Sequence, residues 1–183
     1  MNLGLNEQAE NLAKALKGES KIQGDWGEYQ LERLLEDVGL EKGVHFTTQS
    51  SVKSDDGKNL RPDFLVSLPD EKVLVIDSKV SLTAYEKCVN TQDDSERDAF
   101  LKEHIQSLRN HIRSLAKKDY ASLYDKSVDY TLMFVPIEPA YFAVGPELQA
   151  IQREGLAARV ILVSTTTMLA TLRTVSYIWR QEL

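Results

Sequence analysis

The stretch KVLVIDSKV, residues 72–80, decides the fold, because it joins the pattern of a core strand to charged side chains near its end. Its four consecutive aliphatic residues, 73–76, are typical of a strand that is buried in a sheet. In an extended strand, side chains two residues apart point to the same face. Asp77 and Lys79 are therefore expected to project side by side. Taken alone, such a pair is more often a solvated ion pair at a sheet edge. Whether it belongs to a functional site depends on which other side chains lie near it.

The preceding stretch RPDFLVSL, residues 61–68, predicts a second strand, and the following PDEK predicts a tight turn. A hairpin of this kind brings Asp63, at the start of one strand, close to Asp77 and Lys79 at the end of the next. Two adjacent carboxylates repel each other, and burying them unpaired is costly. A hard divalent cation such as Mg²⁺ or Mn²⁺ relieves this repulsion, since it takes oxygen ligands. We therefore expect Asp63 and Asp77 to bind metal, with Lys79 orienting a water that attacks a phosphodiester.

A third carboxylate comes from GDWGEYQLERLLEDVGL, residues 24–40, which predicts a helix with Asp25 as its N-cap and Gly39 as its stop. Leucine and valine recur at helical spacing from residue 31 to residue 38 and define a buried stripe. Glu28 lies on the flank of this stripe, where it could reach the sheet as a further metal ligand or base. The alternative is a carboxylate that is simply solvated.

The rest of the chain predicts one mixed α/β domain. Residues 44–52, 61–68 and 72–80 are expected to form an antiparallel meander of three strands, with the Asp-Gly turn of residues 54–59 between the first two. Helices are expected at 81–90, at 95–118 and in parts of 139–156, short buried strands at 129–138 and 159–164, and a last helix, capped by Ser164, at 165–183. Residues 1–20 predict a helical segment, expected to be the end of a truncated coiled coil, and residues 21–183 the domain itself.

The composition narrows the class of protein. The chain has 183 residues, which is enough for one domain with a sizeable core, and a formal net charge of −6. Phosphate binding needs Lys and Arg, so this charge argues against a surface that grips nucleic acid everywhere, but it leaves room for a local basic groove. The sequence has one cysteine, Cys88, expected to be buried, and neither a secretory signal nor a long apolar run. We expect a cytoplasmic protein without membrane contact by this part of the chain.

Further candidate residues are ambiguous. Basic residues that could contact a DNA backbone, or could equally belong to solvated surfaces, are Arg61, Lys87, Arg109, Arg113 and Lys117. Glu138 lies at the end of the strand expected at 129–138, where it could support the metal ligands or could instead stabilise a helix N-terminus. His104 and His111 are too far apart along one helix to chelate one ion together. Their role is expected to be structural, with substrate contact as the alternative.

The set Glu28, Asp63 and Asp77-Ser78-Lys79 resembles the PD-(D/E)xK nuclease superfamily. With it, GDWGEYQLERLLEDVGL, RPDFLVSLPDEKVLVIDSKVSLTAYEKC, NHIRSLAKKDY, LMFVPIEPAY and LATLRTVSYIWRQ are together similar to the DNA recombination protein RmuC family, over residues 22–183. The resemblance implies a restriction-endonuclease-like core of helix, three-strand meander, helix and strand, with further helices and one more short strand. It also implies a role in DNA recombination or rearrangement.

Two functions follow as expectations. The first is a Mg²⁺- or Mn²⁺-dependent deoxyribonuclease with Glu28, Asp63, Asp77 and Lys79 as catalytic residues. The second is a non-catalytic DNA-binding or scaffolding module that acts through a coiled coil and partners. The resemblance implies that the complete protein has a long N-terminal coiled coil, which would favour self-association and is in some relatives anchored to a membrane.

Overall fold

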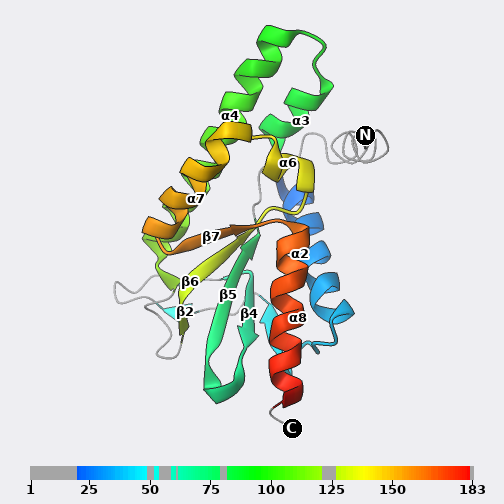
Figure 1. Ribbon diagram of the computed structural model, residues 1–183, viewed down its shortest axis with the longest axis vertical. Coiled ribbons are helices and arrows are strands. Elements are labelled where there is room, and N and C mark those ends of the chain that lie inside the picture. Colours follow the sequence, from blue (N-terminus) through cyan, green and yellow to red (C-terminus); the bar gives the residue numbers. More distant parts are fainter. Residues whose placement is uncertain are drawn as a thin grey trace.

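A five-stranded sheet with the strand order β1-β4-β5-β6-β7 forms the centre of the molecule (Figure 1). The computed structural model describes residues 20–48, 52–53, 59–60, 62–78, 82–120 and 127–181. The strands of the sheet are β1 (Phe46–Thr48), β4 (Phe64–Ser67), β5 (Val73–Ser78), β6 (Ser127–Phe134) and β7 (Val160–Val163). The expected mixed α/β class is confirmed.

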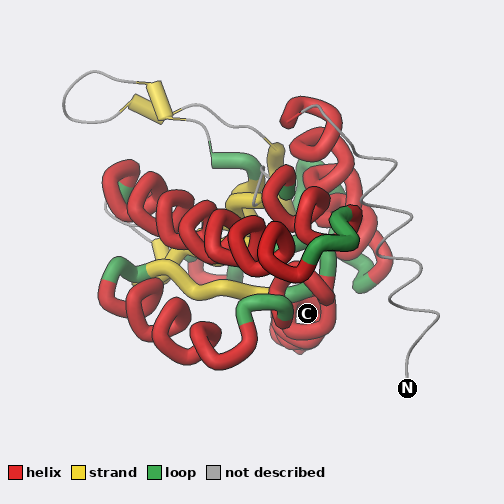
Figure 2. Tube along the Cα trace, turned by 90° about the horizontal axis from the view of Figure 1, so that it is seen from above, coloured by secondary structure: helices red, strands yellow, loops and turns green. Residues whose placement is uncertain are grey.

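The sheet changes from antiparallel to parallel at β5. β1, β4 and β5 pair antiparallel in sequence order, which confirms the predicted meander, and the 3₁₀ turn η1 (Pro69–Glu71) closes the β4–β5 hairpin. β6 and β7 then add parallel to β5 through helical crossovers. A second, two-stranded sheet of β2 (Val52–Lys53) and β3 (Asn59–Leu60) flanks the predicted Asp-Gly turn. Figure 2 shows this pair standing apart from the helices.

Helices cover both faces of the sheet. One face is covered by α2 (Ser20–Asp37) and α8 (Thr165–Gln181), whose Leu31, Leu35, Met168 and Leu172 are buried in a shared core. The other face is covered by α3 (Thr83–Asn90), α4 (Asp94–Lys118), α6 (Glu138–Phe142) and α7 (Leu148–Ala157), with the 3₁₀ turn η2 (Gly145–Glu147) before α7. Figure 1 shows α2 beside α8 and α4 beside α7.

Alternation along β5 assigns its side chains to these two layers. Leu74 and Ile76 belong to the core under α2 and α8, whereas Val75 belongs to the core under α4 and α7. Since side chains alternate along a strand, Asp77 points to the α4 layer and Ser78 points to the α2 layer. The end of β5 therefore presents one polar residue to each helical layer.

The predicted N-cap at Asp25 is wrong, because α2 already begins at Ser20 and runs through Gly24 and Gly27. Glycine weakens an isolated helix, but here both glycines are buried and Gly27 lies directly against the sheet. Tertiary packing therefore overrides the local signal. The predicted stop is confirmed, since Gly39 has a φ of +91°, a left-handed conformation that suits glycine.

Other predicted boundaries shift by a few residues. The strand predicted at 129–138 is β6, which ends at Phe134, and Glu138 begins α6 instead of ending that strand. Ser164 directly precedes α8 as predicted, and the Thr167 N–H lies 3.5 Å from its Oγ. The segment of residues 1–19, predicted to be helical, lies outside the described residues. None of the described helices is both long enough and apolar enough to cross a membrane.

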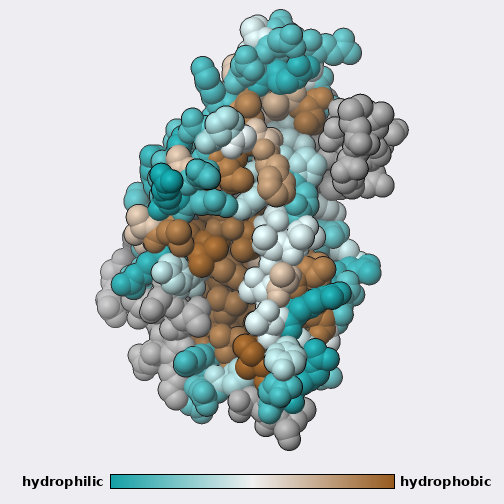
Figure 3. All heavy atoms as spheres, in the orientation of Figure 1, coloured by the Kyte–Doolittle hydropathy of each residue, from teal (hydrophilic) through white to brown (hydrophobic). Residues whose placement is uncertain are grey.

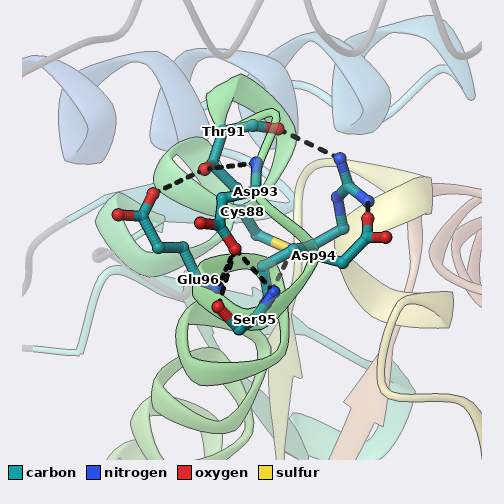
Figure 4. A network of polar contacts seen from close by, with 7 residues as sticks. Cys88, Thr91, Asp93, Asp94, Ser95 and Glu96 are labelled. Atoms are coloured by element: carbon teal, nitrogen blue, oxygen red, sulfur yellow. Dashed lines mark hydrogen bonds and ion pairs between the residues drawn. The ribbon is translucent and has the colours of Figure 1, made fainter.

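A polar network fixes the turn between α3 and α4 (Figure 4). Asp93 caps α4, with its Oδ1 accepting from the N–H of Ser95 at 2.8 Å and of Glu96 at 3.3 Å. Thr91 Oγ1 donates to Glu96 Oε2 at 2.8 Å, and Arg97 binds both Asp94 Oδ1 and the Thr91 carbonyl. This corner lies at the end of an arm that extends beyond the sheet and is hydrophilic, whereas apolar residues gather between α7 and α8 (Figures 1 and 3).

Candidate functional site

The β4–β5 hairpin brings the two predicted metal ligands together. Phe64 is paired with Ile76, so the next positions outward in this antiparallel register are Asp63 and Asp77. Side chains at directly opposite positions lie on the same face with Cβ atoms about 5 Å apart. Like charges at such positions are destabilising. The hairpin thus creates a close pair of acids where the sheet ends.

Asp63 is tied to β5 by its side chain. Its Oδ2 accepts a hydrogen bond from the N–H of Ser78 at 2.8 Å. This bond holds the carboxyl group beside the strand that carries Asp77. Oδ1 of Asp63 takes no part in this bond.

The electrostatics of Asp63 reflect its neighbours. Burial, above all, and the nearby charge of Asp77 raise the pKa of the Asp63 carboxyl from 3.8 to about 8. Glu28 raises this pKa further, both through its charge and through a side-chain hydrogen bond, while the Ser78 N–H acts in the opposite direction. Asp77 and Glu28 therefore both act on Asp63, and Glu28 reaches the carboxyl group that precedes β4.

Asp77 is held by α4, on the face of the sheet opposite to α2. Its side chain is almost fully buried, and its Oδ2 lies 2.8 Å from Nε2 of His111 on α4. The sequence offered His111 only as a structural or substrate-contacting residue, so this contact was not foreseen. Asp77 and His111 are 34 residues apart in the chain. The sequence pattern does not predict which turn of α4 faces the end of β5.

The N-terminal half of α2 closes the site from the other side. The side chain of Gln23 is buried, and its Oε1 accepts from the N–H of Leu82, just beyond β5, at 2.9 Å. A Cβ built on Gly27 would lie 2.7 Å from Ser78 Oγ, so a larger residue at this position would force the Ser78 side chain to shift. Within the described part of the chain, this buried Ser78 Oγ has no hydrogen-bond partner.

We expect Gly27→Ala to lower the free energy of unfolding by about 1–2 kcal/mol, because overpacking costs about 1–3 kcal/mol and the better helix propensity of alanine offsets up to about 1 kcal/mol of it. Ser78→Ala should be close to neutral, because it removes a buried hydroxyl without a partner. In the double variant the colliding Oγ is gone, so at least half of the loss should be recovered. Urea unfolding of all four proteins measures this coupling. Strictly additive effects would show that the two residues do not meet.

The donor chemistry of the site fits a hard divalent cation. Among the described residues, no group of three or more His, Cys, Asp and Glu side chains is arranged as a ready-made metal site. Mg²⁺, however, is commonly bound by only one or two carboxylates and keeps several waters. Asp63 and Asp77 are two such carboxylates, and one oxygen of each lies outside the bonds to the Ser78 N–H and to His111. A cation bound there would take the place of the hydrogen bond between Asp63 and Glu28. Lys79 and Arg61 lie outside the described residues, so their predicted roles stay predictions.

The other predicted DNA contacts lie on α3 and α4. Arg109 binds Glu154 at 2.8 Å and Glu147 at 3.2 Å, so carboxylates already neutralise much of its charge. Lys87, Arg113 and Lys117 are exposed, with Lys87 lying over the ring of Phe100. A DNA contact by any of these residues stays a prediction.

Glu138 shows the second of its two anticipated roles. Its Oε1 accepts from the N–H of Thr166 in the first turn of α8 at 2.6 Å, and it also begins α6. A carboxylate at a helix N-terminus is stabilised by the unpaired N–H groups there. Cys88 is buried as expected, with its Sγ 3.7 Å from the Arg97 carbonyl.

Fold and site together define a mixed α/β domain with an acidic cluster at the end of its central hairpin. Comparison with known proteins assigns the family. The model of the RmuC family matches residues 1–183, and the chain belongs to this family.

Named relatives agree with this assignment. The chain is 48% identical, over its full length, to a DNA recombination protein RmuC homolog of Haemophilus influenzae, of which it covers 41%. It is 45% and 44% identical, again over its full length, to the DNA recombination protein RmuC of Salmonella typhimurium and of Escherichia coli, covering 38% of each. The chain thus spans about two fifths of the length of these relatives.

Proposed function

We propose that this chain is a divalent-metal-dependent DNA nuclease domain that acts in DNA recombination. The relatives are named DNA recombination proteins, which supports the process. The order of helix, three-strand meander, helices and parallel strand is compatible with a restriction-endonuclease-like core, which supports the reaction class.

The observation that carries the proposal is the buried pair Asp63 and Asp77. Two carboxylates lie at opposite positions of a hairpin, and burial, above all, together with the charge of Asp77 raises the pKa of Asp63 to about 8. If only the stability of the fold mattered, a neutral residue in place of one of them would raise the free energy of unfolding. The presence of both at one sheet end, beside Glu28, is expected where a cation is to be bound.

Asp63 and Asp77 would hold Mg²⁺ or Mn²⁺, and Glu28 would serve as a further ligand or as a base. When bound, the cation would supply charge stabilisation at the phosphate. Lys79, by its place in the sequence motif, is proposed to orient the attacking water. In the hydrolysis, the water oxygen bonds to phosphorus, the bond from phosphorus to one ester oxygen breaks, and the departing oxygen takes up a proton.

A non-catalytic DNA-binding or scaffolding module is the second candidate. It is favoured by the finding that, among the described residues, no group of three or more His, Cys, Asp and Glu side chains is arranged to hold a metal ion. DNA is the proposed partner in both cases. Self-association through a coiled coil stays a prediction.

Incubating the protein with labelled single-stranded, duplex and hairpin DNA separates the two candidates. With Mg²⁺ or Mn²⁺ we expect cleavage of at least one substrate, and with EDTA none, as seen on denaturing gels. Binding in a mobility-shift assay without cleavage under any metal condition would support the module and contradict the nuclease. Glu36→Gln, which changes an exposed carboxylate of α2, is the matched control and should cleave as the wild type does.

A further inference from the structure

His111 of α4 contacts a carboxylate of the site. Its Nε2 lies 2.8 Å from Asp77 Oδ2, and the two side chains are only 17% and 6% exposed. An ionised carboxylate only accepts hydrogen bonds, so Nε2 is the nitrogen that carries the hydrogen when Asp77 is charged. One Asp77 oxygen is thereby committed to α4, and Oδ1 is the oxygen left for another partner.

The position of His111 is rigidly set. It lies in the middle of the 25-residue helix α4, whose Leu108, Ile112 and Leu115 are buried in the core between this helix and the sheet. Asp77 in turn is fixed by the pairing of β5 with β6, where it lies opposite Met133. A short hydrogen bond between two such elements leaves the Asp77 carboxylate little freedom to rotate.

We propose that His111 is a positioning residue, which orients Asp77 so that Oδ1 is the oxygen presented to the cation. The inference rests on the proposed function and adds a residue that the acid-and-lysine motif does not contain. Residues that hydrogen-bond a metal ligand orient it, and their loss typically weakens metal binding or activity by about 10–100-fold.

Three substitutions test this hydrogen bond. In glutamine the side-chain amide nitrogen is as many bonds from Cα as Nε2 is in histidine, whereas in asparagine it is one bond closer. His111→Gln can therefore still donate to Asp77, and His111→Asn and His111→Ala cannot. His104→Asn is the matched control, since His104 is a second buried histidine of α4, and its Nε2 contacts the Ala140 carbonyl instead.

Mn²⁺ affinity, measured by electron paramagnetic resonance of the free ion, is the readout, with thermal melting to verify folding. We expect His111→Asn and His111→Ala to bind Mn²⁺ about 10–100-fold more weakly, and His111→Gln and His104→Asn to stay within about threefold of the wild type. Equal affinity in all His111 variants would overturn the inference and leave the proposed nuclease standing. A loss in His111→Gln as large as in His111→Ala would also overturn it. A wild type that binds no Mn²⁺ would overturn both.

Discussion

An Asp77→Asn variant should lose metal-dependent DNA cleavage by on the order of a thousandfold or more, because it loses the charge of a proposed cation ligand. Asparagine has the shape of aspartate, and its oxygen can still accept from Nε2 of His111, so the contact between β5 and α4 is kept. DNA binding should therefore change little, and the variant should stay folded. Single-turnover cleavage with excess enzyme measures the chemical step directly.

Two comparisons make this result decisive. Glu36→Gln removes an exposed carboxylate in the same way and should retain full activity. If Asp77→Asn cleaves at the wild-type rate, the cleavage does not depend on the acid pair. The proposed site would then be wrong even though the protein is a nuclease.

An Asp63→Asn variant should be more heat-stable than the metal-free wild type at pH 8.5, and this advantage should shrink as the pH falls towards 4. Burial and the charges of Asp77 and Glu28 raise the pKa of Asp63 to about 8 in the folded protein, whereas the unfolded chain titrates near 3.8. Between these values the unfolded state has released a proton that the folded state keeps, so wild-type stability falls as the pH rises. The Asp63→Asn variant has no carboxyl group to titrate at this position, so it does not lose this stability as the pH rises.

The size of the effect is measurable. Each unit of pKa difference corresponds to about 1.4 kcal/mol, and one kcal/mol moves the melting temperature of a domain of this size by about 2–4 °C. We expect a gain of at least about 4 °C at pH 8.5 in EDTA. Mg²⁺ should restore part of the lost stability in the wild type. A difference that stays constant from pH 4 to pH 9 would show that Asp63 does not titrate as described.

Local sequence patterns were sufficient to predict the β4–β5 hairpin and the long helix α4. The aliphatic run before Asp77 and the PDEK turn predicted the β4–β5 hairpin, and the hairpin by itself implied that Asp63 and Asp77 lie close together. The periodic apolar residues of α4 predicted that helix, which begins at Asp94, one residue before its predicted start.

What could not be predicted depends on how distant elements pack. Asp25 has the chemistry of an N-cap, yet α2 continues through it and packs against β5, where Gly27 lies directly beside Ser78. The contact of His111 with Asp77 depends on the rotation of α4 about its axis. That rotation depends on the burial of all the apolar side chains of α4 together. No single pair of residues in the sequence predicts it.

The hydrogen bond from the Ser78 N–H to Asp63 Oδ2 makes one backbone amide a spectroscopic probe of the site. Most amides in a sheet donate to a carbonyl, whose charge does not change with pH or with added cations. The Ser78 amide donates to a titrating carboxyl group instead, so its proton chemical shift should follow the ionisation of Asp63 and the arrival of Mg²⁺. A single resonance can thus report on the acid pair in the absence of any DNA substrate.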